Sequence, residues 1–315
     1  MKEKLIIANL YRAKNKISYF ALHQVINRLP EFDIEFHILW DNSEYKDEWT
    51  DKFNNLNCKI ISYTKEQLND YCLQMGIEQD FIEGFKKFYN IYFLLLPHYL
   101  RKHFGFGYYL QYDDDIILKE DIDELKYAIK EQLPCLLMEP MNQNCDKSIA
   151  NKLIEMYPGS FERYKQFNPN MWGFNAGFMG VRLEIYDDFL DPKGFKELLE
   201  LFNYEGIYDD NGVEKVGVER GLIDTQQQSF FSTMNQIATT KPPYVLPYPD
   251  YYCCPNWGTH PYYGEIENQN EYEGWDVAMK SKIVHFIGHT VLEGRHYGKP
   301  KYYHKLVDEY LTKNK

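Results

Sequence analysis

The sequence predicts an α/β fold with a mostly parallel central sheet flanked by helices. Three observations lead to this prediction. Short apolar segments alternate with longer segments in which apolar residues recur at helical spacing. The chain has 315 residues, of which 44% are hydrophobic, so it can bury a sizeable core. No repeat, low-complexity linker or clear boundary divides it, and we therefore expect a single domain over residues 1–315.

The first half of the chain alternates expected strands with expected helices. The strands are apolar runs at residues 5–8, 34–39, 58–62 and 108–112. The helices have apolar residues three and four positions apart, at residues 16–29, 65–75, 84–103 and 121–130. Pro97 is expected to kink or divide the third of these helices, because proline has no N–H and its ring clashes with the preceding turn. Such alternation predicts a parallel sheet covered by helices.

The second half is less regular. Strands are expected at residues 175–183 and 281–286, and helices at residues 193–202, 224–236 and 302–312. Residues 204–221 and 293–301 are rich in polar residues and glycine and are expected to be loops. Residues 242–261 are rich in proline and tyrosine, and they are expected to be irregular.

The composition limits the partners and the location. Lys and Arg number 35 against 47 Asp and Glu, which gives a net charge of −12 and argues against nucleic-acid binding, because that needs a basic surface. The longest apolar run, residues 91–97, is too short to span a bilayer. Six cysteines without a CxxC pair, and no secretory leader, predict reduced thiols in the cytoplasm. The aromatic content of 17% would suit a carbohydrate ligand, although ordinary core packing also accounts for it.

Three consecutive acids, Asp113, Asp114 and Asp115, follow the expected strand 108–112. The carboxyl ends of parallel strands are where α/β sheets bind ligands. Neighbouring carboxylates repel one another, and a divalent cation such as Mg²⁺ or Mn²⁺ removes that conflict. In extended chain Asp113 and Asp115 would point to one side, while Asp114 would cap a backbone N–H or face a ligand. The alternative is a solvated loop, which is how we interpret the acids at residues 121–124.

A histidine, His285, stands near the end of the last expected strand. Neutral imidazole is a good ligand for Mn²⁺ and a poorer one for Mg²⁺, whereas a purely structural histidine is the alternative. His289, Arg295, His296 and Lys299 follow in the expected loop, where cations could meet a diphosphate. The alternative for that segment is a polar surface loop.

These motifs together resemble those of glycosyltransferase family 8, which includes glycogenin and bacterial lipopolysaccharide galactosyl- and glucosyltransferases. The similar segments are YLQYDDDIIL at residues 109–118, DIDEL at 121–125, FNAGFMG at 174–180, and HFIG at 285–288 followed by Lys299 and Pro300. Each is moderately specific, and their shared order is much more so. The similarity extends from Leu5 to about Tyr303.

The resemblance implies a GT-A (Rossmann-like) fold and a metal-dependent hexosyltransferase. Its donor would be a UDP-sugar, its cofactor Mn²⁺ (or Mg²⁺), its acceptor a saccharide, glycoconjugate or other hydroxyl compound, and its stereochemical course retention. Residues from 1 to about 120 would form the nucleotide-sugar-binding half, and residues 121–315 the acceptor-binding half.

The resemblance also assigns roles to residues of this chain. The metal ligands would be Asp113, Asp115 and His285. The first strand end would hold the nucleoside, Asn175 and Ala176 would line the donor-sugar pocket, and Asp224, Gln227 and Gln228 would lie near the anomeric carbon as catalytic residues. The full set of implied donor-binding residues is Ala8, Asn9, Tyr11 (a candidate stacking partner for the base), Asp113, Asp114, Asn175, Ala176, Gly288, Arg295 and Lys299.

The chain departs from the family pattern at Asn9, where the family commonly has an acid, and at Phe93, where it commonly has an arginine. Three alternatives stay open. One is an inverting GT-A glycosyltransferase with another nucleotide-sugar, in which Asp224 or Glu219 acts as the base. A second is a sugar nucleotidyltransferase, although no glycine-rich phosphate loop follows the first strand. A third is a noncatalytic carbohydrate-binding protein, which leaves the acidic run unexplained.

Overall fold

The computed structural model describes residues 2–9, 16–39, 49–84, 88–138, 174–202, 239–246, 251–255, 259–260, 264–265, 280–287 and 301–314. A seven-stranded sheet in the order β3-β2-β1-β4-β7-β6-β8 lies at the centre of this part of the chain. Its strands are β1 (Glu3–Asn9), β2 (Phe32–Leu39), β3 (Lys59–Tyr63), β4 (Tyr108–Tyr112), β6 (Cys135–Met138), β7 (Phe174–Arg182) and β8 (Tyr244–Leu246).

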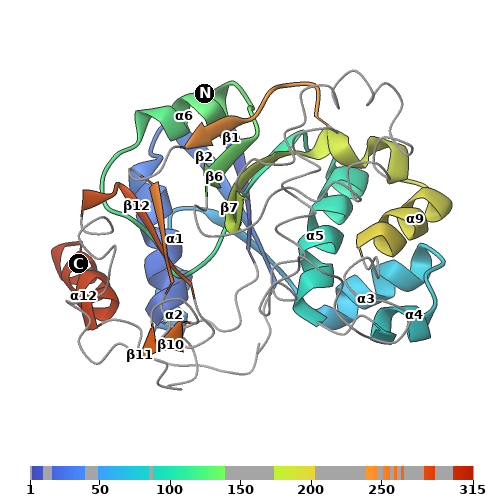
Figure 1. Cartoon of the computed structure of the whole chain (residues 1–315), viewed down its shortest axis with the longest axis horizontal. Coiled ribbons are helices and arrows are strands. Elements are labelled where there is room, and N and C mark those ends of the chain that lie inside the picture. The colour runs from blue at the N-terminus through green and yellow to red at the C-terminus, as the bar shows by residue number, and fades with distance from the viewer. Residues whose placement is uncertain are drawn as a thin grey trace.

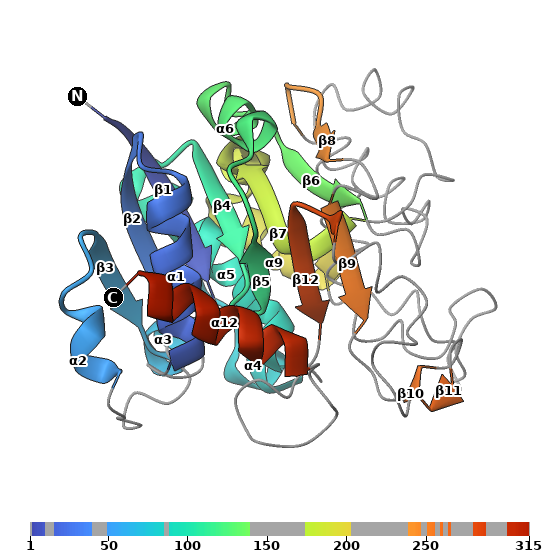
Figure 2. The same ribbon diagram turned by 90° about the vertical axis from the view of Figure 1, so that its left-hand side faces the viewer.

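The direction of the strands confirms the predicted fold class. The pairs β1–β2, β2–β3, β1–β4 and β6–β8 are parallel, and only β7 runs against both of its neighbours, β4 and β6. Figures 1 and 2 show this sheet between two layers of helices. No helix among the described residues is long and apolar enough to cross a membrane.

One layer contains α1 (Lys16–Arg28) and α6 (Asp123–Lys130), with α12 (Lys301–Lys313) packed beside α1. The other contains α3 (Lys65–Gln74), α4 (Gln79–Gly84), α5 (Phe88–Phe104), the 3₁₀ helix η1 (Leu183–Phe189) and α9 (Pro192–Phe202). The short helix α2 (Thr50–Phe53) precedes β3.

β1 has a continuous apolar sequence because it is buried on both faces. Leu5 and Ile7 pack in the core beneath α1, whereas Ile6 and Ala8 pack in the core beneath α5. A strand covered on both sides gains from apolar residues at every position, which is typical of central strands in parallel sheets.

α5 continues through Pro97, so the predicted division of this helix does not occur. Proline removes one backbone hydrogen bond from a helix. Leu94, Leu95 and Leu96 directly before it and Leu100 after it are each at most 1% exposed. Burial of a leucine side chain contributes about 1.5–3 kcal/mol, so the packing of this helix face outweighs the lost bond.

A smaller sheet contains the strand on which His285 lies. It joins β5 (Ile116–Leu118), β12 (Ile283–Ile287) and β9 (Tyr251–Pro255) in the order β5-β12-β9. A separate pair of short strands is formed by β10 (Thr259–His260) and β11 (Gly264–Glu265).

The prediction that residues 242–261 are irregular is wrong, because they contain β8, β9 and β10. Prolines 242, 243 and 247 flank β8 rather than interrupt it. Tyr244 at its start donates a backbone hydrogen bond of 2.6 Å to Pro134 O. Proline at strand ends costs no ladder bond, so the tyrosine and aliphatic residues between the prolines can still pair.

Candidate metal centre

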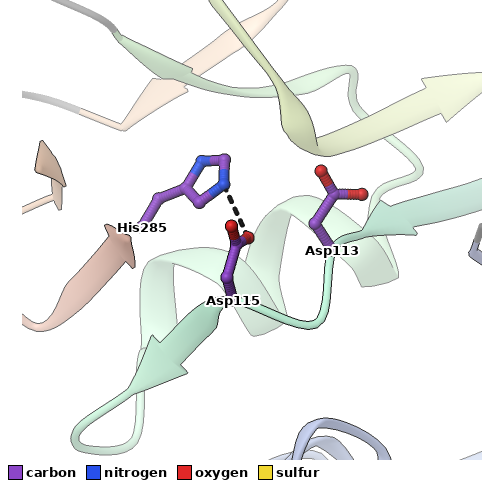
Figure 3. A group of neighbouring side chains, drawn as sticks. All are labelled: Asp113, Asp115 and His285. Atoms are coloured by element: carbon purple, nitrogen blue, oxygen red, sulfur yellow. Dashed lines mark ion pairs between the residues drawn. The ribbon is translucent and has the colours of Figure 1, made fainter. Parts of the chain in front are cut away.

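The structure brings Asp113, Asp115 and His285 together, as Figure 3 shows. One ligand atom from each lies within 4.8 Å of the other two. Nε2 of His285 is 2.8 Å from Oδ1 of Asp115. Within the described ranges, these residues are the one group of three or more His, Cys, Asp or Glu side chains that could hold a metal ion.

Asp113 is positioned by the main sheet. It directly follows β4, and its backbone N–H donates a 2.7 Å hydrogen bond to Gly177 O in β7. The neighbouring pair Tyr112 and Phe178 continues the antiparallel ladder between the two strands. The NAGF segment of the sequence therefore lies beside the acidic run, although the two are far apart in the chain.

The acidic run turns rather than extends, so the predicted alternation of its side chains is wrong. Asp114 and Asp115 lie in a turn between β4 and β5, in which Ile116 N donates to Asp113 O at 3.4 Å. A bond from residue i+3 to residue i is typical of a β-turn. Reversal of the chain, and not a shared face of a strand, brings the carboxylates of Asp113 and Asp115 together.

His285 reaches the turn through strand pairing. β12 runs antiparallel to β5, and His285 lies opposite Ile116, the residue after Asp115. Opposite residues of an antiparallel pair have Cα atoms about 4.5–5.5 Å apart, close enough for the neighbouring side chains to meet. The register of this small sheet thus determines the distance between the imidazole and the carboxylates.

The centre is largely removed from solvent. Asp115 is 8% exposed and His285 is 4% exposed, and Asp113 is half-buried. Burial raises the pKa of the neighbouring Tyr112 phenol well above its ordinary value, and Tyr310 and the three carboxylates raise it further. Tyr112 is therefore a neutral donor, and it bonds Ile116 O at 3.2 Å.

The residues fit a divalent cation. Asp113, Asp115 and His285 offer two carboxylates and one imidazole within 4.8 Å of one another, a set of oxygen and nitrogen ligands that Mg²⁺ or Mn²⁺ would accept. A protonated His285 would offset one of the two carboxylate charges, whereas a divalent cation would offset both. One imidazole with two carboxylates suits Mn²⁺ better than Mg²⁺.

Two glutamines that the sequence interpretation did not select also belong to this region. Gln111 is 2% exposed, and its Nε2 donates to Oδ1 of Asp113 at 3.3 Å. Gln24 of α1 is fully buried and bonds both β4 and β5. The sequence did contain a signal for Gln24, because it is a polar residue on the largely apolar face of α1. A buried amide needs hydrogen-bond partners, so its position indicated a specific contact.

The end of β1 lies beside the strand that leads to the centre. Ala8 pairs with Gln111, two positions before Asp113. Ala8 and Asn9 are both 1% exposed, and Nδ2 of Asn9 has no hydrogen-bond partner among the described residues. The chain thus places a buried amide at the carboxyl end of β1.

The other expected site residues are only partly covered. Asn175 and Ala176 lie in β7 just before Gly177, so their backbone is next to Asp113. Their side chains are not among those that the structure describes. Seven expected site residues lie outside the described ranges altogether, namely Tyr11, Asp224, Gln227, Gln228, Gly288, Arg295 and Lys299.

Comparison with solved structures finds similar chains among glycosyltransferases. Mouse xyloside xylosyltransferase 1 in its apo form matches 90% of this chain and 98% of its own at 13% identity, with a TM-score of 0.44. The galactosyltransferase LgtC, in complex with donor and acceptor sugar analogues, matches 96% of each chain at 12% identity, with a TM-score of 0.46. The glycosyltransferase GlyE from Streptococcus pneumoniae matches all of this chain and 64% of its own at 11% identity, with a TM-score of 0.47.

No protein-family model matches the sequence, and a search of curated proteins finds no match.

Proposed function

We propose that this chain is a metal-dependent glycosyltransferase that transfers a hexose from a UDP-sugar to a hydroxyl group of a saccharide or glycoconjugate, with retention. The observation that carries the proposal is the convergence of Asp113, Asp115 and His285 within 4.8 Å beside the carboxyl end of β4. This is the edge of a parallel sheet where ligands bind. The motif resemblance to glycosyltransferase family 8 supports the same reaction.

Asp113, Asp115 and His285 would hold the cation, for which we propose Mn²⁺ with Mg²⁺ as a substitute. A divalent cation here supplies a Lewis acid that stabilises negative charge on the leaving diphosphate. Gln111 orients Asp113 through its 3.3 Å bond to Oδ1. The β12 strand orients His285, so the ligand set is held before the donor arrives.

The nucleoside would lie at the end of β1, against Ala8, Asn9 and Tyr11. The support within the described residues is Asn9, since its buried Nδ2 offers a hydrogen bond to a ligand. Asp114, Asn175 and Ala176 would face the donor sugar from the turn and from β7. Gly288, Arg295 and Lys299 would surround the diphosphate, where cations complement its charge.

The acceptor reaction would take place near Asp224, Gln227 and Gln228. With retention, the departing phosphate takes the proton of the acceptor hydroxyl, and the protein needs no strong base. We further propose one domain over residues 1–315, in which residues up to about 120 bind the nucleotide-sugar and residues 121–315 bind the acceptor. We propose a cytoplasmic location for the protein, supported by the free thiols of Cys58, Cys72 and Cys135.

The proposal is tested by incubating the purified chain and Mn²⁺ with a panel of nucleotide-sugars and measuring the nucleoside diphosphate released. We expect release of UDP from one UDP-hexose and its loss when a chelator is added. No release from any donor, together with no metal-dependent binding of UDP or GDP, would overturn the proposal in favour of a carbohydrate-binding protein.

A matched pair of variants distinguishes the loss of a carboxylate in the candidate metal centre from the loss of a carboxylate elsewhere on the protein. Asp115→Asn removes a carboxylate charge from the centre with little change in shape, and we expect turnover to fall to background. Asp123→Asn makes the same change at an exposed position in the first turn of α6. Turnover of this control should stay close to that of the unmodified chain.

A further inference from the structure

Gln24 of α1 connects the two strands on either side of the acidic turn. Its Nε2 donates a 2.6 Å hydrogen bond to Ile116 O, and its Oε1 accepts a 3.0 Å bond from Leu118 N. The same Nε2 contacts the hydroxyl of Tyr112, which itself bonds Ile116 O at 3.2 Å. All of these groups are buried.

The amide of Gln24 takes the place of a neighbouring strand. β5 is an edge strand of the small sheet, and Lys119 N, just after it, donates to Lys282 O next to β12 at 2.9 Å. Backbone groups of a strand alternate between its two edges, so Leu118 N and Ile116 O belong to the edge away from β12. One side-chain amide satisfies both, in the way that a peptide group of an adjacent strand would.

A second residue of α1 extends this contact. Arg28 lies one turn after Gln24 and therefore on the same face of the helix. Its guanidinium donates a 2.7 Å bond to Lys119 O and a 3.2 Å bond to Oδ1 of Asp121. The helix thus holds β5 along its whole outer edge, from the residue after Asp115 to the residue after the strand.

Backbone pairing requires an amide at this position, because an apolar side chain would leave the buried Ile116 O and Leu118 N without these bonds. The neighbouring stripe of α1 is apolar, with Phe20, Ala21 and Val25 each at most 1% exposed. A buried backbone group that loses its hydrogen bond costs about 1–3 kcal/mol. The two bonds are also directional, and they determine where β5 begins and hence where Asp115 stands.

We propose that Gln24 is a positioning residue of the metal centre. By holding Tyr112 before the acidic turn and Ile116 after it, Gln24 sets the separation of the Asp113 and Asp115 carboxylates and thereby the affinity for the cation. This inference rests on the proposed function, because it takes the cluster to be a metal site. It adds a residue of α1, a helix that carries none of the three proposed metal ligands.

The test measures Mn²⁺ affinity of the full chain from the electron paramagnetic resonance signal of free Mn²⁺, with the melting temperature of each variant measured alongside. Gln24→Met keeps the length of the side chain and removes its two bonds to β5 together with its contact to the Tyr112 hydroxyl. Tyr112→Phe removes only the hydroxyl that links Gln24 to Ile116 O. Asn27→Leu is the matched control, since it removes another amide of α1, one that bonds the Tyr310 hydroxyl of α12 at 2.9 Å.

We expect Gln24→Met to bind Mn²⁺ about tenfold more weakly than the unmodified chain, as is usual when a group that orients a metal ligand is lost. Tyr112→Phe should show a smaller loss in the same direction, and it decides the question if Gln24→Met does not fold. Asn27→Leu should lower the melting temperature without changing the affinity.

The outcomes separate this inference from the proposed function. If the unmodified chain binds Mn²⁺ and Asp115→Asn does not, while Gln24→Met and Tyr112→Phe bind as tightly as the unmodified chain, the role of Gln24 is overturned and the metal site stands. An equal loss of affinity in Asn27→Leu would likewise overturn it, by showing general destabilisation. Absence of Mn²⁺ binding in the unmodified chain would overturn both.

Discussion

Nε2 of His285 lies 2.8 Å from Oδ1 of Asp115, and this contact joins two segments that are 170 residues apart in the sequence. Asp115 follows the fourth strand of the main sheet, whereas His285 arrives on the last strand of the smaller one. Such a contact forms only when both sheets have folded and paired in register. The candidate centre is thus a tertiary feature, which no single segment of the sequence could form alone.

Loss of His285 should remove metal-dependent stabilisation. A ligand at 100 times its dissociation constant stabilises a folded protein by about 2.7 kcal/mol, so saturating Mn²⁺ should raise the melting temperature of the unmodified chain. His285→Ala removes one of three ligands, and its melting temperature should respond to the same Mn²⁺ concentration much less. Thermal denaturation with Mn²⁺ and with a chelator checks this. An equal rise in both proteins would place the cation elsewhere.

Gly180→Ala should destabilise the main sheet by about 1–3 kcal/mol, the usual cost of overpacking a core. A Cβ at this position of β7 would stand 1.9 Å from the Tyr108 hydroxyl and 3.1 Å from Cβ of Cys135. Urea denaturation measures the loss. Addition of Tyr108→Phe removes the hydroxyl oxygen and should restore part of the stability. Full stability of Gly180→Ala alone would show that Tyr108 moves aside freely.

His98 should make the protein less stable as the pH falls below neutrality. Burial lowers the pKa of this imidazole to about 4, against 6.5 for an exposed histidine, while its bond to Phe189 O opposes the shift. Between these two pH values, His98 is therefore protonated in the unfolded chain and neutral in the folded chain. The stabilisation is complete above pH 6.5 and is lost between about pH 6.5 and 4, by up to about 1.4 kcal/mol per pH unit.

The comparison of His98→Gln with the unmodified chain isolates this effect from that of other histidines. Urea denaturation at pH 7.5 and at pH 5 should show a smaller loss of stability on acidification in the variant. Glutamine can still reach the Tyr71 hydroxyl, which lies 2.7 Å from Nδ1 of His98, so the variant should fold. Parallel pH dependence in the two proteins would contradict the assignment.

Local features of the fold were predictable from the sequence because they depend on nearest neighbours. β4 spans residues 108–112 as expected, and α1 and α9 begin and end within one residue of their expected bounds. Each is a strongly apolar or strongly amphipathic segment, for which periodicity is informative. β5 and β6 were missed since each is very short, and the burial of β5 depends on partners distant in the sequence.

The candidate centre was predictable in its residues but not in its geometry. Two acids directly after a strand and a histidine near the end of the last strand pointed to Asp113, Asp115 and His285, which do converge. The turn that brings the carboxylates together depends on β5 reversing toward β12, and the bonds of Gln24 depend on α1 lying against β5. The apolar pattern of a segment predicts its secondary structure, but it does not indicate which distant segment will pair with it.

The proposed metal-dependent donor site is tested most directly by measuring UDP binding by titration calorimetry in the presence of Mn²⁺ and in the presence of a chelator. We expect binding with Mn²⁺, no binding with the chelator, and no binding with Mn²⁺ once Asp113 and Asp115 are both replaced by asparagine in a protein that still folds. Equal binding of UDP with and without the metal, or unchanged binding by the doubly substituted protein, would contradict this expectation.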